Sequence, residues 1–318
     1  SPLCDHQYLP FAPDTRALHK TTGQRNKMKR IKWLAIFALL LAAGATMSAR
    51  IAHNAGAIGA GYAAKQICSG VFVARLPEHF VLNTDVLPRL ATVAPLPHLL
   101  SYNVDTQQRT VTARMLGQKV RVEHQPTSGC TLLSEDALSA RSQLETPAHY
   151  VSLARKAADS TLPVSAINPA IRKALNTAFA EPPEGGRNTL AVIVMHRGEI
   201  VAERYQTPVT INTPMQGWSM NKSLMATFIG QQIDRGRLSL DDSVAEALKT
   251  AGAEAFLVSL VSPDLTLGHL LSMTSGFDFA ERYFPGDDVT DMLYREPGMW
   301  LSAPATGHAR PPGEQFAY

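Results

Sequence analysis

The sequence predicts a mixed α/β (α+β) fold. Two apolar segments, 189–195 and 199–205, flank a tight turn at 196–198, a pattern typical of a β-hairpin. Segments with helical spacing and capping signals follow at 217–230, 240–248 and 266–273. Of the 318 residues, 45% are apolar and 18% charged, which is enough apolar material for a globular core.

The N-terminal 49 residues have the pattern of an export signal. The basic segment 28–32 precedes an uncharged run from Trp33 to Ala49, and 43–45 is a suitable cleavage site for a signal peptide. Uncut, residues 33–49 would anchor the chain in the inner membrane, and a buried soluble helix is the alternative. Residues 28–49 are therefore predicted to be a signal peptide or membrane anchor. We expect an exported protein, periplasmic or anchored facing the periplasm.

Residues 1–27 are expected to be a non-native upstream or disordered segment, because they contain no Met, precede Met28 and lack periodicity. Residues 1–32 hold seven Lys and Arg against two Asp, whereas the whole chain has a net charge of +3. The remaining residues are therefore mildly acidic and present no basic face for nucleic acid.

Residues 50–162 are predicted to form an accessory region with a small β unit at 66–132 and a linker at 134–162. Segments 71–73 and 100–124 have β character, and a hairpin is expected around Leu116-Gly117. Cys68 and Cys130 lie in this exported part, and a disulfide between them is expected. Two buried free thiols are the alternative.

Residues 163–318 carry the candidate chemistry. A helix is expected at 168–179, with Pro169 in its first turn. The apolar run 189–195 suits a strand covered on both faces. Asp241-Asp242 introduces the short helix through Leu248, where helix capping explains the acidic pair better than a metal site does. Residues 277–310 are expected to be irregular.

Ser219 and Lys222 lie three residues apart at the start of the helix predicted for 217–230, so their side chains share one face. A serine hydroxyl becomes nucleophilic when a nearby base takes its proton, and a neutral lysine can be that base. Apolar residues at helical spacing are expected to bury this helix: Leu224, Met225, Phe228 and Ile229. The alternative is a Ser N-cap followed by an exposed Lys.

Three segments together identify a family. Gly-Trp-Ser-Met-Asn-Lys-Ser at 217–223, Leu-Thr-Leu-Gly-His-Leu-Leu-Ser-Met-Thr-Ser-Gly at 265–276 and Pro-Pro-Gly-Glu-Gln-Phe-Ala-Tyr at 311–318 resemble the serine β-lactamase-related family, on its class C and esterase side. The resemblance covers roughly residues 165–318. It implies a β-lactamase/transpeptidase-like fold, with an antiparallel sheet flanked by helices and a helical subdomain.

The resemblance also implies roles. Ser219 matches the nucleophile and Lys222 the lysine that activates it. Tyr318 matches the tyrosine of the Tyr-x-Asn motif, which moves protons together with the lysine. The backbone N–H of Ser219 would form half of an oxyanion hole. The expected substrate is a small-molecule ester or amide, with no cofactor and no metal.

The residues of the serine motif at 217–223 are similar to those of aminohexanoate-dimer hydrolases and related esterases. Segment 277–283 is similar to one in those amidases that carries a substrate-contacting tyrosine, so Tyr283 is a candidate for that contact. An ordinary packed or surface tyrosine is the alternative.

Several family features are absent from the 318 residues. The sequence stops at Tyr318, before the Asn of Tyr-x-Asn, the later Lys/His-Thr/Ser-Gly motif and the C-terminal sheet strands. We therefore expect a truncated hydrolase with an exposed hairpin edge, low activity and poor solubility.

Other functions stay open. One is a penicillin-binding D-Ala-D-Ala carboxypeptidase, and another is a non-catalytic truncated envelope protein. A Ser-His-Asp hydrolase is disfavoured, because no Gly-x-Ser-x-Gly segment occurs and His196, His269 and His308 are isolated.

Overall fold

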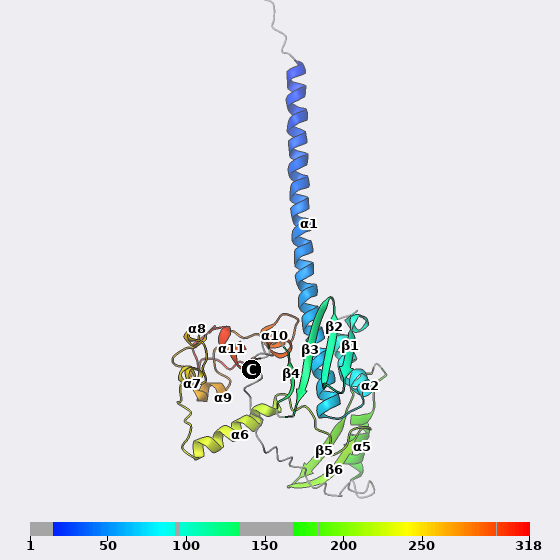
Figure 1. Cartoon of the computed structure of the whole chain (residues 1–318), viewed down its shortest axis with the longest axis vertical. Coiled ribbons are helices and arrows are strands. Elements are labelled where there is room, and N and C mark those ends of the chain that lie inside the picture. The colour runs from blue at the N-terminus through cyan, green and yellow to red at the C-terminus, as the bar shows by residue number, and fades with distance from the viewer. Residues whose placement is uncertain (1–14, 93–95, 127, 134–167, 184, 297) are drawn as a thin grey trace, which may run out of the picture. The chain divides into compact units, whose positions relative to one another are not determined.

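The computed structural model describes residues 15–92, 96–126, 128–133, 168–183, 185–296 and 298–318. The chain divides into two compact units, Ser1–Ala52 and His53–Tyr318. The linker expected at 134–162 lies outside the described residues. The predicted fold class is confirmed, since antiparallel sheets are combined with helices (Figure 1).

The first described element is the long helix α1 (Thr15–Cys68), blue in Figure 1. It is helical from Thr15 onwards, so the described part of residues 1–27 belongs to this helix. Each residue added to an existing helix gains a hydrogen bond at low entropic cost, so the apolar helix continues into the basic segment before it. The stretch Lys32–Val73 is long and apolar enough to cross a membrane, as a signal or an anchor requires.

The accessory region of the second unit forms a four-stranded antiparallel sheet. Strands β1 (Ser101–Asp105), β2 (Thr110–Met115), β3 (Gln118–Gln125) and β4 (Gly129–Leu132) follow one another in chain order. The expected hairpin joins β2 and β3, where Leu116 and Gly117 take φ angles of 49° and 78°. Positive φ at both central residues is what a tight type I′ turn requires.

The core of this region lies between the sheet and the C-terminal end of α1. Ile67 and Cys68 pack with buried side chains of β2 and β3: Val111, Ala113, Met115 and Val122. Short helical segments connect α1 to the sheet: η1 (Ser69–Val73), α2 (Glu78–Val81), η2 (Leu82–Val86), α3 (Leu87–Leu90) and η3 (Leu96–Leu99).

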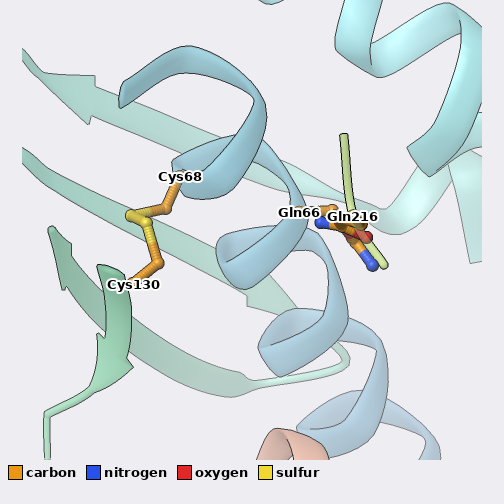
Figure 2. Close-up of a disulfide and its surroundings, with 4 residues drawn as sticks. All are labelled: Gln66, Cys68, Cys130 and Gln216. Carbon is orange, nitrogen blue, oxygen red and sulfur yellow. A yellow bond between two sulfur atoms is a disulfide. The ribbon is translucent and has the colours of Figure 1, made fainter. Parts of the chain in front are cut away.

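The structure contains the predicted disulfide between Cys68 and Cys130, which links the end of α1 to β4 (Figure 2). The β character predicted for 71–73 is wrong, because these residues belong to the π-helical turn η1. This turn continues directly from α1 beside the disulfide, and such tertiary context overrides the β propensity of two valines and a phenylalanine.

The hairpin of the second half is present, but its burial differs from the prediction. Strands β5 (Ala191–His196) and β6 (Glu199–Tyr205) pair antiparallel, and helix α5 (Pro169–Phe179) packs on them through Leu175. In β5, Ile193 and Met195 are 52% and 63% exposed, so the expectation of a strand covered on both faces is wrong. Helix α5 covers one part of this two-stranded sheet, and the exposed side chains of β5 lie away from it.

Helices dominate the rest of the described chain. They are α6 (Met220–Asp234), α7 (Val244–Thr250), α8 (Ala255–Ser259), α9 (Leu267–Leu271), α10 (Asp288–Tyr294), η6 (Met299–Leu301) and α11 (Ser302–Ala305). Residues 277–310 are therefore only partly irregular, since three of these helices lie among them. A small core of Leu248, Val258, Val261 and Leu265 holds the α7–α9 region together.

Candidate active site

Ser219 lies at the N-terminus of α6 with its hydroxyl turned toward a lysine. It occupies the N-cap position, but its side chain makes no capping hydrogen bond. Instead, Lys222 Nζ donates a hydrogen bond to Ser219 Oγ at 3.1 Å. One helical turn separates the two residues, as their spacing predicts. The hydroxyl is therefore paired with the amine, at an N-cap position and beside an exposed lysine, where the alternative interpretation also places them.

The backbone just before Ser219 is strained. Trp218 has a φ of 42°, in the left-handed region that costs a non-glycine residue about 1–2 kcal/mol. A Cβ added to Gly217 would lie 2.9 Å from Asn221 Oδ1, so only glycine fits the turn without a shift. Strained residues cluster at functional sites. No residue pattern around Trp218 predicts its strain, whereas Gly217 allows the close approach of the backbone to Asn221.

Tyr318 lies beside the same lysine. Lys222 Nζ is 4.6 Å from the centroid of the Tyr318 ring, within the range of a cation–π contact. The structure thus brings together Ser219, Lys222 and Tyr318, and the lysine amine lies against both of the other side chains.

Backbone hydrogen bonds attach the C-terminal segment to the segment after α9. Ala317 N–H donates to the Met273 carbonyl and Gly313 N–H to the Thr274 carbonyl, each at 2.8 Å. With the Lys222–Tyr318 contact, these bonds gather all three segments that identify the family, 217–223, 265–276 and 311–318. Sequence order alone could not establish that they meet.

The α9 segment is held by an N-terminal capping box. The Thr266 side chain accepts from the His269 backbone N–H, and the His269 ring accepts from the Thr266 backbone N–H. His269 therefore acts as a helix-capping residue in this structure. The two bonds satisfy donors that a short helix otherwise leaves free, so they fix the start of α9.

Tyr283 lies on a separate, small pocket of about 100 Å³, with Tyr62, Arg89 and Tyr294 also on its wall. Its hydroxyl donates to Glu281 Oε1 at 3.1 Å. Burial raises the pKa of the Tyr283 phenol, and the Glu281 carboxylate adds to the effect through its hydrogen bond and its charge. The Tyr318 phenol raises this pKa slightly and the Arg89 guanidinium lowers it. Glu281 is a partner that sequence reasoning missed.

The predicted burial of the serine helix is wrong. Leu224, Met225 and Phe228 are 51%, 56% and 48% exposed, and α6 has no buried residue. Among the described residues, no other element packs tightly over these side chains, and a helix is buried only where a partner surface covers it. Lys222 is exposed as well, so the described residues do not enclose its amine in an apolar environment.

No group of three or more His, Cys, Asp or Glu side chains in the described ranges is arranged to hold a metal ion. Asp242 Oδ2 accepts from the Ser239 N–H at 2.8 Å, which agrees with a local structural role for this carboxylate. His308 Nε2 accepts a hydrogen bond from the Ser262 backbone N–H at 2.9 Å. Both residues are far from Ser219 in the sequence.

Comparison with known proteins agrees with the motifs. The model of the Beta-lactamase family matches residues 172–318. Over 116 residues, the chain is 38% identical to penicillin-binding protein 4 of Amycolatopsis lactamdurans. That match covers 35% of this chain and 27% of the relative, so the chain spans about a quarter of the length of the curated protein it matches. The family resemblance recognised from the three segments is confirmed for residues 172–318.

Proposed function

With residues 172–318 assigned to the Beta-lactamase family, we propose that this protein is a serine hydrolase that cleaves a small-molecule ester or amide through an acyl-enzyme. One observation carries the proposal: the Lys222 amine lies 3.1 Å from Ser219 Oγ and 4.6 Å from the Tyr318 ring centroid. A nucleophile, a base and a second proton carrier then share one site.

In the proposed acylation, Ser219 Oγ attacks the substrate carbonyl carbon, and its proton passes to Lys222 Nζ. This step requires the uncharged form of the Lys222 amine. The proton then crosses the hydrogen bond of 3.1 Å between Ser219 Oγ and Lys222 Nζ. The backbone N–H of Ser219, at the positive end of the α6 dipole, stabilises the oxyanion. The bond to the leaving group breaks, and Lys222 with Tyr318 returns the proton to the departing alkoxide or amine. Water then hydrolyses the acyl-serine and releases the acid.

Covalent labelling tests the proposal. An alkyl fluorophosphonate should phosphonylate Ser219 in the intact protein, and the label should be lost in Ser219→Ala. Ser223→Ala is the matched control, because it removes a hydroxyl from the next turn of the same helix. Equal labelling of Ser219→Ala, or no labelling of the unmodified protein, would refute the proposal.

A penicillin-binding carboxypeptidase is the second candidate, favoured by the name of the relative described above. The same serine would attack the β-lactam carbonyl, and slow deacylation would leave a stable adduct. A penicillin adduct on Ser219 that persists for hours would favour this function, whereas rapid turnover favours an esterase or amidase. If neither reagent reacts, a non-catalytic envelope protein becomes the better account. We further propose that α1 contains the export signal or anchor, so that the folded region faces the periplasm.

A further inference from the structure

A second, larger pocket lies next to the serine turn. Its volume is about 480 Å³. The apolar part of its wall comes from two regions that are far apart in the chain: Val73, Leu76, Phe80 and Val81 from the accessory region, and Met215 and Trp218 from the segment before α6. The accessory side lies outside the family match at 172–318, so the family resemblance does not account for this pocket.

The two walls are joined by a hydrogen bond and supported by the disulfide. Gln216 Nε2 donates to Gln66 Oε1 at 2.6 Å, and Gln66 is only 4% exposed. Figure 2 shows these two amides meeting on one side of the end of α1, with the Cys68–Cys130 disulfide on the other side. Cys130 itself lines the pocket. The segment that leads into Ser219 is therefore attached to the covalently fixed end of α1.

Trp218 connects the pocket wall to the candidate nucleophile along the chain, although Ser219 itself does not line the pocket. This residue lines the pocket and immediately precedes Ser219, so their Cα atoms are about 3.8 Å apart across a trans peptide. The strained φ of Trp218 directs the chain from the pocket wall into the first turn of α6. A ligand in the pocket would therefore contact the residue next to Ser219 in the chain.

The chemistry of the wall selects an apolar ligand. Asp85 is the one charged residue among those that line it, and its Oδ1 already accepts a hydrogen bond from the Tyr62 hydroxyl at 2.9 Å. The pocket is many times larger than the volume of about 30 Å³ that one water molecule takes in the liquid. It therefore has room for a group much larger than an acetyl group. Its size falls in the range of small-molecule sites, which are mainly apolar with a few polar groups.

We infer that this pocket binds the acyl chain of the substrate, so that the enzyme prefers esters or amides of medium-chain fatty acids. This inference rests on the proposed serine hydrolase function for the reaction itself. The acyl-serine would carry the chain into the pocket between the accessory region and the turn at Trp218, and hydrolysis would release the fatty acid. The accessory region would thus set substrate selectivity.

The hydrolysis test uses p-nitrophenyl esters from acetate to decanoate and the full chain. Burying one methylene stabilises by about 0.8 kcal/mol, so kcat/KM should rise about fourfold per added methylene until the pocket is full. Ala74 lines the pocket, and Ala74→Phe should remove most of this rise along the ester series. Ala255→Phe, the same substitution at an exposed residue of α8, is the matched control. Equal rates along the ester series in an active enzyme would overturn the inference.

A binding measurement separates failure of the pocket from failure of the chemistry. Titration calorimetry of Ser219→Ala with decanoate should show saturable binding that acetate does not reproduce, and Ala74→Phe in the same background should weaken it at least tenfold. Absence of decanoate binding overturns the pocket inference whatever the hydrolytic activity. Decanoate binding in a protein that fluorophosphonate does not label would support the pocket and refute the proposed hydrolase.

Discussion

Removing the Cys68–Cys130 disulfide should destabilise the accessory region strongly. The two cysteines are 62 residues apart, and the disulfide restricts the unfolded chain over that whole loop. The loop-entropy relation gives about 4 kcal/mol for a loop of this length at 25 °C. Both half-cystines also pack in or against the core, and Cys68 is fully buried. The double variant Cys68→Ala, Cys130→Ala therefore loses a large part of the stability of an ordinary domain.

Urea unfolding followed by circular dichroism measures this loss. With a slope of about 2–3 kcal/mol per M, a loss of 4 kcal/mol lowers the midpoint by about 1.5–2 M. Cys4→Ala is the control, since it removes the third cysteine of the chain and leaves the disulfide intact. Reduction of the unmodified protein should reproduce the loss.

A small effect would refute this reasoning. If the midpoint of the double variant fell by less than about 0.3 M at an unchanged slope, the loss would be below about 1 kcal/mol. The end of α1 would then be held on β4 by apolar packing, with little contribution from the covalent link. Such a result would also remove the disulfide as a support for the pocket wall beside Ser219.

Three further predictions concern single side chains. Lys222→Ala should slow phosphonylation of Ser219 about 10²–10⁴-fold, because general-base assistance is lost; a rate within threefold of the unmodified protein would contradict this role. Thr266→Ala should lower the unfolding free energy by about 1 kcal/mol in urea, since it removes the α9 cap, and an unchanged midpoint would exclude that contribution. Burial lowers the pKa of His308, so the unfolded state binds its proton more readily. Stability should therefore be full above the unfolded pKa of about 6.5 and should fall below it, and His308→Gln should reduce the difference between urea midpoints at pH 7.5 and 5.0.

Local signals predicted local structure well. The Leu116-Gly117 turn, the helix after Asn168 and the capped start of α9 depend on residues within four positions of one another. For example, the Asn168 side chain accepts from the Ala170 N–H at 2.8 Å, as a helix N-cap should. Interactions over such short separations leave a pattern that can be read from the sequence.

Burial was harder to predict, because it depends on the surface that a distant segment provides. The apolar patterns of β5 and α6 indicate which side chains would favour burial, but not whether a partner covers them. In the described residues Met195 and Met225 remain exposed. The prediction of β structure for 71–73 was wrong for a related reason. The conformation of this segment follows from its attachment to α1 and the disulfide.

The candidate site contains one contact that local spacing predicts and others that depend on distant segments. The Ser219–Lys222 pair spans one helical turn, so its spacing alone predicts the contact, whereas the place of Tyr318 beside Lys222 required the family's motif order. The hydrogen bond between Gln66 and Gln216 joins residues 150 positions apart, and no sequence pattern in either segment predicts it. Yet this bond attaches the wall before Ser219 to the accessory region. If the pocket selects the acyl chain, the reaction follows from the family segments, and the choice of substrate follows from a contact specific to this chain.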